Sequence, residues 1–216
     1  MIKKYARFSA LFFAVILSLP FLSAQDHQER WSTLDVQHYC YDIQLSDTSD
    51  IIFCNAEVEI LFKTDVQNFS LDFANLSPEG RGMIIDRITE NGVQVPFIHE
   101  KNHLHFQGNE SLEGTTRKLL IDYHGIPNDG LIISENKFGD RTFFGDNWPN
   151  RAHHWLPVVD HPSDKATVEF IIKAPSHYGV VSIGSKTREI WDEEYITTHW
   201  EMKVPLSTKL MVLGVS

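Results

Sequence analysis

Apolar and polar residues alternate along most of this chain with a period of two. The alternation is clearest in residues 39–45 and 52–62, and it recurs at Phe69, Leu71 and Phe73. Successive side chains of a β-strand point to opposite faces of its sheet, so this pattern predicts strands that bury one face. No run of ten or more residues after residue 24 has the period of an amphipathic helix.

A hairpin turn is predicted at Asn91-Gly92, because this pair suits a two-residue turn between residues 83–90 and 93–99. Residues 127–162 are rich in Asn, Asp, Gly and Pro and show little periodicity, so a long loop is expected there. Further strands are predicted at residues 103–106, 118–123, 166–174, 180–183, 195–203 and 207–213. Many short strands of this kind predict an all-β sandwich or open barrel.

The first residues have the layout of a secretory signal peptide. Lys3, Lys4 and Arg7 precede an apolar run at residues 8–19, and the small residues that signal cleavage favours end at Ala24. A membrane anchor is the alternative, but a spanning helix needs about 20 apolar residues. We therefore expect a signal peptide at residues 1–24, a loose leader at 25–33, and a secreted or periplasmic protein that leaves the membrane after cleavage.

The charge balance argues against nucleic acid as a partner. The chain has 29 acidic and 19 basic residues, a net charge of -10. Removal of residues 1–24 takes away three basic residues, which leaves 16 against 29 and a net charge of -13. A protein this acidic repels phosphate backbones and anionic membranes.

The two cysteines, Cys40 and Cys54, flank a predicted turn, and secretion permits a disulfide between them. Side-chain parity argues against it. Tyr39 and Tyr41 belong to the apolar face of the first strand, which leaves Cys40 on the other face, whereas Cys54 follows Ile52 on the apolar face of the second strand. Only a bulge that shifts the register would let them meet.

Eleven histidines raise the question of a metal site. His103 and His105 are two apart on a predicted strand, where a solvated face is the simpler interpretation. A second group, His153, His154 and His161, lies in a segment broken by prolines and lacks a recognised ligand spacing. The sequence contains no H-E-x-x-H motif, so we predict no metal site in this chain.

Aromatic residues are dense in the long loop between Phe138 and Trp155. Exposed rings could form a sugar-binding platform. The alternative is that Phe143, Phe144, Trp148 and Trp155 anchor the loop on the sheet, since a long loop without secondary structure must be either anchored or mobile. We favour anchoring, with part of the loop facing a neighbouring domain.

An ordered series of short motifs carries a family resemblance. Residues 41–45 read Y-D-I-Q-L, residues 155–157 read W-L-P, residues 160–168 read D-H-P-S-D-K-A-T-V, and residues 205–210 read P-L-S-T-K-L. The series resembles the aminopeptidase N family of zinc metallopeptidases, the gluzincin aminopeptidases, over nearly all of the chain after residue 34. The resemblance implies a saddle-like β-sandwich or open-sheet domain at residues 34–216.

In the family that this chain resembles, such a domain precedes a catalytic zinc domain that removes N-terminal residues from peptides. The H-E-x-x-H and G-x-M-E-N motifs of that domain are absent from these 216 residues. The resemblance therefore implies a fragment or truncated product without cofactor or catalysis of its own. Zinc, peptide substrates and a following catalytic domain belong to the full-length enzyme. The alternative is a stand-alone secreted β-sandwich that binds a partner or acts as a scaffold and has lost catalysis.

The resemblance also points to one site residue. The family's β-domain supplies a polar residue to the pocket for the substrate's free amine, from a T-Q-x-E-like segment shortly before an Ala-Arg pair. The matching region here is residues 142–152, in which the usual Gln is missing. Asp146 is the best chemical match, because a carboxylate pairs with an ammonium group. Its alternative role is that of a turn residue before Asn147.

Overall fold

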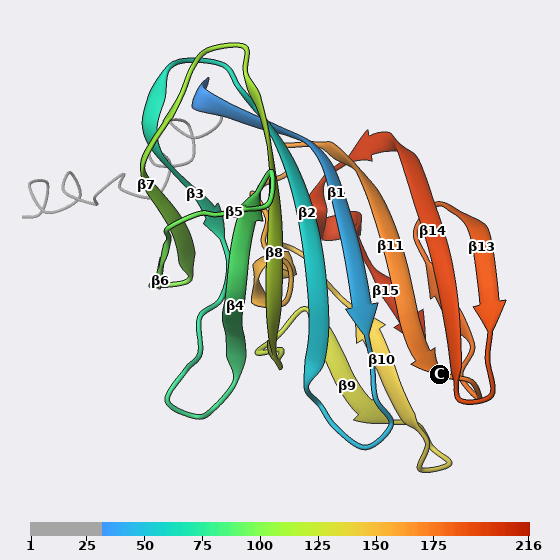
Figure 1. Cartoon of the computed structure of the whole chain (residues 1–216). Helices are drawn as coiled ribbons and strands as arrows, with labels where there is room; N and C mark the ends of the chain where they lie inside the picture. The colour runs from blue at the N-terminus through green and yellow to red at the C-terminus, as the bar shows by residue number, and fades with distance from the viewer. Residues whose placement is uncertain (1–31) are drawn as a thin grey trace, which may run out of the picture.

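The computed structural model describes residues 32–216, except the side chain of Asn109, and almost all of its regular structure is β (Figure 1). Two one-turn 3-10 helices, η1 (Ala152–His154) and η2 (Thr208–Leu210), are the helical elements that it labels. The predicted all-β class is confirmed. The predicted signal peptide at 1–24 and leader residues 25–31 lie outside the described residues. Within residues 32–216, no helix is long and apolar enough to cross a membrane.

An eight-stranded sheet forms the body of the fold. Its strand order is β13-β14-β11-β1-β2-β8-β4-β5, and the pair β1–β11 is parallel while the other pairs are antiparallel. The bounds are β1 (Leu34–Gln44), β2 (Ile52–Phe62), β4 (Gly82–Glu90), β5 (Val93–Gln94), β8 (Thr116–Ile126), β11 (Ala166–Pro175), β13 (Ser185–Trp191) and β14 (Tyr195–Leu206).

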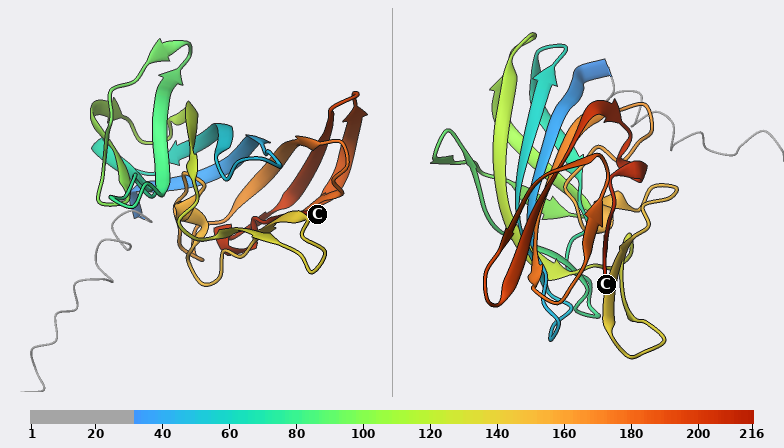
Figure 2. Two further views of the ribbon diagram at one scale, coloured as in Figure 1. Left: turned by 90° about the horizontal axis from the view of Figure 1, so that it is seen from below. Right: turned by 90° about the vertical axis from the view of Figure 1, so that its right-hand side faces the viewer.

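Two smaller sheets complete the fold. A four-stranded sheet has the order β12-β15-β10-β9 and a three-stranded sheet the order β3-β7-β6. The two further views show how the large sheet curves and how the four-stranded sheet lies against it (Figure 2). The bounds are β3 (Val66–Asp72), β6 (Ile98–Glu100), β7 (His103–Ser111), β9 (Leu131–Glu135), β10 (Arg141–Gly145), β12 (Val180–Ser182) and β15 (Leu213–Val215).

Aromatic rings join the sheets into one core. Phe62 of β2 packs edge-on against Phe69 of β3, with ring centroids 5.1 Å apart, and Tyr123 of β8 packs edge-on against Phe73 at 4.8 Å. The buried faces of these strands belong to a single hydrophobic cluster. Edge-to-face pairs stabilise the contact beyond the effect of the buried area alone. They therefore fix how the small sheet sits on the large one.

Three buried tyrosines of the large sheet hold the segment 155–159 across its inner face. The hydroxyl of Tyr41 donates to the carbonyl of Pro157 at 3.2 Å, and that of Tyr123 donates to the carbonyl of Trp155 at 2.8 Å. The hydroxyl of Tyr39 accepts a hydrogen bond from the N–H of Val159 at 3.0 Å. A buried hydroxyl needs a partner, so each tyrosine fixes one point of the loop.

The strand predictions are confirmed where one face is buried, and residues 52–62 coincide with β2. Two of the strand predictions are wrong in detail. The run 93–99 divides into β5 and β6, which belong to different sheets, and the run 207–213 contains η2 and only the first residue of β15. The loop predicted at 127–162 contains the hairpin β9–β10, and β13 was not predicted, because all seven of its residues are exposed and show no alternation.

Parity keeps the two cysteines apart, as predicted, and both are free. Cys40 lies opposite Glu57, and Cys54 lies opposite Ile43. The bulge in this strand pair falls between Val36 and His38, so it does not bring the thiols to one face.

Candidate functional site

Asp146 directly follows β10, the second strand of the β9–β10 hairpin in the long loop. Its N–H donates to the carbonyl of Gly130 at 2.6 Å, which extends the β9–β10 hairpin by one residue. Gly145, the residue before it, must be glycine here. An added Cβ would lie 2.9 Å from the Cβ of Val212 and 3.0 Å from the backbone nitrogen of Leu213. The close approach of the chain at 212–213 therefore sets the position of Asp146.

Arg151 holds the carboxylate of Asp146. Its Nη2 donates to Asp146 Oδ2 at 2.5 Å, its Nη1 donates to Asp129 Oδ1 at 3.1 Å, and its Nε donates to the carbonyl of Trp148 at 2.5 Å. The Asp146 side chain is 38% exposed. Within residues 32–216, no hydrogen bond reaches its Oδ1. One carboxylate oxygen is thus fixed by the guanidinium group, and the other faces outward.

Asn147 is the buried support of this loop. Its Nδ2 donates to the carbonyls of Thr208 at 3.1 Å and Met211 at 2.7 Å, and its Oδ1 accepts from the indole N–H of Trp155 at 2.8 Å. The amide joins the loop to η2 and to the core. A buried amide with its hydrogen bonds satisfied fixes a single conformation. Asn147, Arg151 and Asp129 had no distinguishing spacing in the sequence and were not predicted as site residues.

The aromatic residues of the loop divide between two roles. Phe143 and Trp155 are buried and anchor the loop, as predicted. Phe144 and Trp148 are 60% and 62% exposed, so the anchoring prediction is wrong for them. Lys209 Nζ lies 4.8 Å from the centroid of the Trp148 ring. The Trp148–Pro149 peptide bond is cis.

An apolar row crosses the exposed face of the four-stranded sheet. Ile132 of β9 lies opposite Phe144 of β10, which lies opposite Gly214 of β15, which lies opposite Val181 of β12. Residues directly opposite one another point to the same side of a sheet. Ile132, Phe144 and Val181 are all exposed, whereas the other face of the sheet is in the core. Three apolar side chains are therefore exposed side by side on this face of the sheet.

Three histidines of the two groups contact acids or a hydroxyl, whereas the buried Nδ1 of His154 has no hydrogen-bond partner within residues 32–216. His153 Nδ1 is 2.7 Å from Asp160 Oδ2, His161 Nδ1 is 2.9 Å from Ser163 Oγ, and His103 Nε2 is 3.3 Å from Asp72 Oδ1. Burial lowers the pKa of His154, and the neighbouring His153 lowers it further. Across the described part of the chain, no three His, Cys, Asp or Glu side chains are placed to hold a metal ion.

Comparison with known proteins gives the family. The family model described as the peptidase M1 N-terminal domain matches residues 35–210. This chain belongs to the peptidase M1 N-terminal domain family. The match covers the large sheet and the loop that carries Asp146, in agreement with the resemblance found in the sequence.

Two relatives of this M1 N-terminal domain show how much of a longer protein it spans. Rat (Rattus norvegicus) glutamyl aminopeptidase is 25% identical in an alignment 202 residues long, and the match covers 81% of this chain and 21% of that protein. The M1 zinc metallopeptidase of Deinococcus radiodurans has the same fold, with a TM-score of 0.73 at 22% identity, over 85% of this chain and 42% of that chain. A further structure of the Deinococcus protein, with a Tyr-Ser-Ala substrate bound, has a TM-score of 0.72, 22% identity and coverage of 85% of this chain and 42% of that chain.

Proposed function

We propose that this chain is the N-terminal domain of a secreted zinc aminopeptidase, which removes N-terminal residues from peptides, and that the chain alone carries no catalysis. The observation that supports this most directly is the family match over residues 35–210. The relatives are named as aminopeptidases or zinc metallopeptidases, and the chain spans 21% and 42% of their lengths. Export is the proposed role of residues 1–24, which lie outside the described residues.

The residues that the structure describes, 32–216, do not fit a catalytic zinc site. Such a site needs three protein ligands and an open position for water. His153 and His103 are each paired with an aspartate, and the sequence lacks the two helical histidines of H-E-x-x-H. We therefore assign zinc and its activated water to a separate catalytic domain, and no catalytic step to the residues described above.

The apolar row Ile132, Phe144 and Val181 supports a docking role. It lies on the sheet that contains β10, next to Asp146 at the end of that strand. A catalytic domain that covers this row would bury apolar side chains that are now exposed. It would also bring its active site close to the outward oxygen of Asp146.

In this proposal Asp146 binds the substrate's N-terminal ammonium group. Arg151 already fixes Oδ2, so the carboxylate is oriented before substrate arrives, and Oδ1 is open to accept a charge-assisted hydrogen bond. The same pairing with Arg151 is also what the alternative role requires, in which Asp146 only stabilises the turn before Asn147. The two roles predict different effects of mutation, which are described below.

The test compares the chain with the full-length protein. The chain alone should not bind zinc in a stoichiometric amount, and it should not hydrolyse a fluorogenic aminoacyl amide. The protein encoded by the whole reading frame should contain one zinc ion and lose its turnover to a chelator. Zinc binding and chelator-sensitive turnover by the chain alone would refute the proposal. A reading frame that ends at Ser216 and yields a stable product would favour the stand-alone module instead.

A further inference from the structure

Strand β3 is one edge of the three-stranded sheet, and only one end of its outer side is paired in the described structure. Asp72, the last residue of β3, exchanges two backbone hydrogen bonds with Val158. The N–H of Asp72 donates to the Val158 carbonyl at 2.6 Å, and the N–H of Val158 donates to the Asp72 carbonyl at 3.1 Å. This single bridge is antiparallel. It shows which way the backbone groups of Asp72 point, namely away from β7.

The alternation of a strand then fixes the groups further along β3. Residues two and four positions before Asp72 present their N–H and C=O groups to the same side. These residues are Ser70 and Asn68, which lie opposite His105 and Gln107 of β7 as non-hydrogen-bonded pairs. The bulge between Val66 and Asn68 ends this regular stretch.

The segment that pairs with Asp72 leaves the edge before it reaches Ser70. The N–H of Val159 donates to the Tyr39 hydroxyl at 3.0 Å, and the N–H of Asp160 donates to the side chain of Asp72 at 2.8 Å. Pro162, two residues further, has no N–H to donate. Within residues 32–216, no hydrogen bond reaches the outward backbone groups of Ser70 and Asn68.

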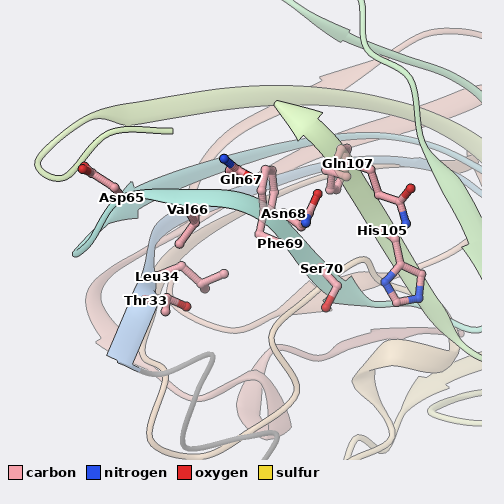
Figure 3. Close-up of a pocket in the computed structure, with 11 residues that line it drawn as sticks. Thr33, Leu34, Asp65, Val66, Gln67, Asn68, Phe69, Ser70, His105 and Gln107 are labelled. Carbon is pink, nitrogen blue, oxygen red and sulfur yellow. The ribbon is translucent and has the colours of Figure 1, made fainter. Parts of the chain in front are cut away.

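A cavity of about 610 Å³ lies along this open stretch, with Thr33 and Leu34 at the beginning of β1 on its other side (Figure 3). The volume is in the range of small-ligand sites. Its polar lining consists of four uncharged side chains of β3 and β7, together with His105 and Asp65; the four are Gln67, Asn68, Ser70 and Gln107. Carboxamides and hydroxyls both donate and accept hydrogen bonds, as peptide groups do.

We infer that this cavity binds an extended peptide from another molecule, which adds a strand to β3 and pairs with the backbones of Ser70 and Asn68. The row of alternating donors and acceptors matches a peptide backbone, and strand addition at a free edge is a recognised mode of peptide binding. Val158 already occupies the first position of such a strand. Asp65 is the one carboxylate among the lining residues, and its Oδ1 already accepts a hydrogen bond from the N–H of Glu113 at 2.8 Å, so an uncharged peptide suits this cavity. The inference is independent of the proposed catalytic partner.

The experiment uses the purified chain and a capped hexapeptide of alternating threonine and valine. In the free chain, the Ser70 and Asn68 amides should exchange with solvent quickly, whereas those of Leu71 and Phe69, which face β7, should exchange slowly. Saturating peptide should protect Ser70 and Asn68. A peptide N-methylated at alternate residues keeps all the N–H groups along one of its two edges, so it should still pair with β3. A fully N-methylated peptide has no N–H group to donate and should not bind.

Two variants at one position form a matched pair. Ser70→Ala keeps the backbone N–H and should bind the peptide as the parent chain does. Ser70→Pro removes that N–H from an outward edge, where proline is tolerated, and should weaken binding about tenfold or more. If Ser70→Pro does not fold, the two methylated peptides decide the question in the parent chain.

Three results would overturn the inference. One is no protection of Ser70 and Asn68 at millimolar peptide, and another is equal binding of the fully methylated peptide. The third is protection of these two amides without any peptide. If it is independent of chain concentration, the chain's own residues cover the edge. If it grows with chain concentration, a second copy covers it.

Discussion

The side chain of Asn147 accepts a hydrogen bond from the indole N–H of Trp155, at 2.8 Å, while its own amide donates to the carbonyl of Met211 at 2.7 Å. One buried amide thus connects the loop after β10 with the core and with the segment before β15. The Asp146 carboxylate stands one residue away, so its position depends on this amide.

Asn147→Ala should lower the free energy of unfolding by about 2–4 kcal/mol, because it leaves Trp155 Nε1 and the Thr208 and Met211 carbonyls without their partner. Urea unfolding monitored by tryptophan fluorescence measures the change. Asn150→Ala, at an exposed neighbouring position, is the control and should change it by less than about 0.5 kcal/mol. Equal effects of the two variants would contradict the role given to Asn147.

The two thiols should remain free and react slowly in the native chain. Burial, followed by the nearby Glu169, Glu57 and Asp42, raises the pKa of Cys40 to about 12. Burial also raises the pKa of Cys54. The thiolate is the reactive form, so a thiol reagent at pH 8 should label little of the native protein and both cysteines once it is unfolded. Stoichiometric native labelling at pH 8, or a disulfide in the unreduced protein, would contradict this expectation.

Asp146→Ala in the full-length enzyme should raise the Michaelis constant for substrates with a free N-terminus. The loss of one charge-assisted contact should cost about 1.5–3 kcal/mol in transition-state stabilisation. Asp129→Ala is the matched control, since it removes the other carboxylate on Arg151 and leaves the Asp146 contact in place. If both variants have the parent's specificity constant, Asp146 is a turn residue only.

Acid should destabilise the fold partly through His99. Burial lowers its pKa below the ordinary 6.5, although its hydrogen bond with the Phe73 carbonyl opposes the shift. The unfolded chain then binds more protons than the folded chain below about pH 6.5, so stability rises with pH across this window. The stabilisation is complete above pH 6.5 and is lost as the pH falls through the folded pKa.

His99→Gln retains an amide that can donate to Phe73, and it removes the titration. Its free energy of unfolding should therefore fall less steeply than that of the parent chain between pH 6.5 and pH 5. His177→Gln, at an exposed position, controls for the loss of one histidine. Parallel pH profiles for the parent and His99→Gln would exclude a contribution from His99.

Sequence reasoning succeeded where one face of a strand is buried. In β2 the buried positions alternate without a break, and its predicted bounds match. It failed at β13, which is exposed on both faces. It also failed at β9–β10, because β10 forms by pairing with β9, in an irregular segment, and with β15, which is distant in sequence. Pairing partners of this kind leave no periodic trace in the strand itself.

The site was predictable only in part. Asp146 could be named, because the family resemblance identifies the segment 142–152 and a carboxylate is the group that pairs with an ammonium ion. Its partner Arg151 could not be named, since nothing in a linear pattern says that a guanidinium five residues away turns back to it. The open edge of β3 depends on where the chain leaves the sheet after Val158, which only the three-dimensional structure shows.

The parallel pair β1–β11 has a consequence for the order of assembly. His38 lies beside Thr167, so the first strand borders a segment that is synthesised nearly 130 residues later. Until residues 166–175 leave the ribosome, β1 can pair with β2 but has an uncovered edge on its other side. Contacts so distant in sequence slow folding and leave unpaired edges open to association with other chains. We therefore expect nascent chains that end before β11 to depend on chaperones, and longer ones to become independent of them.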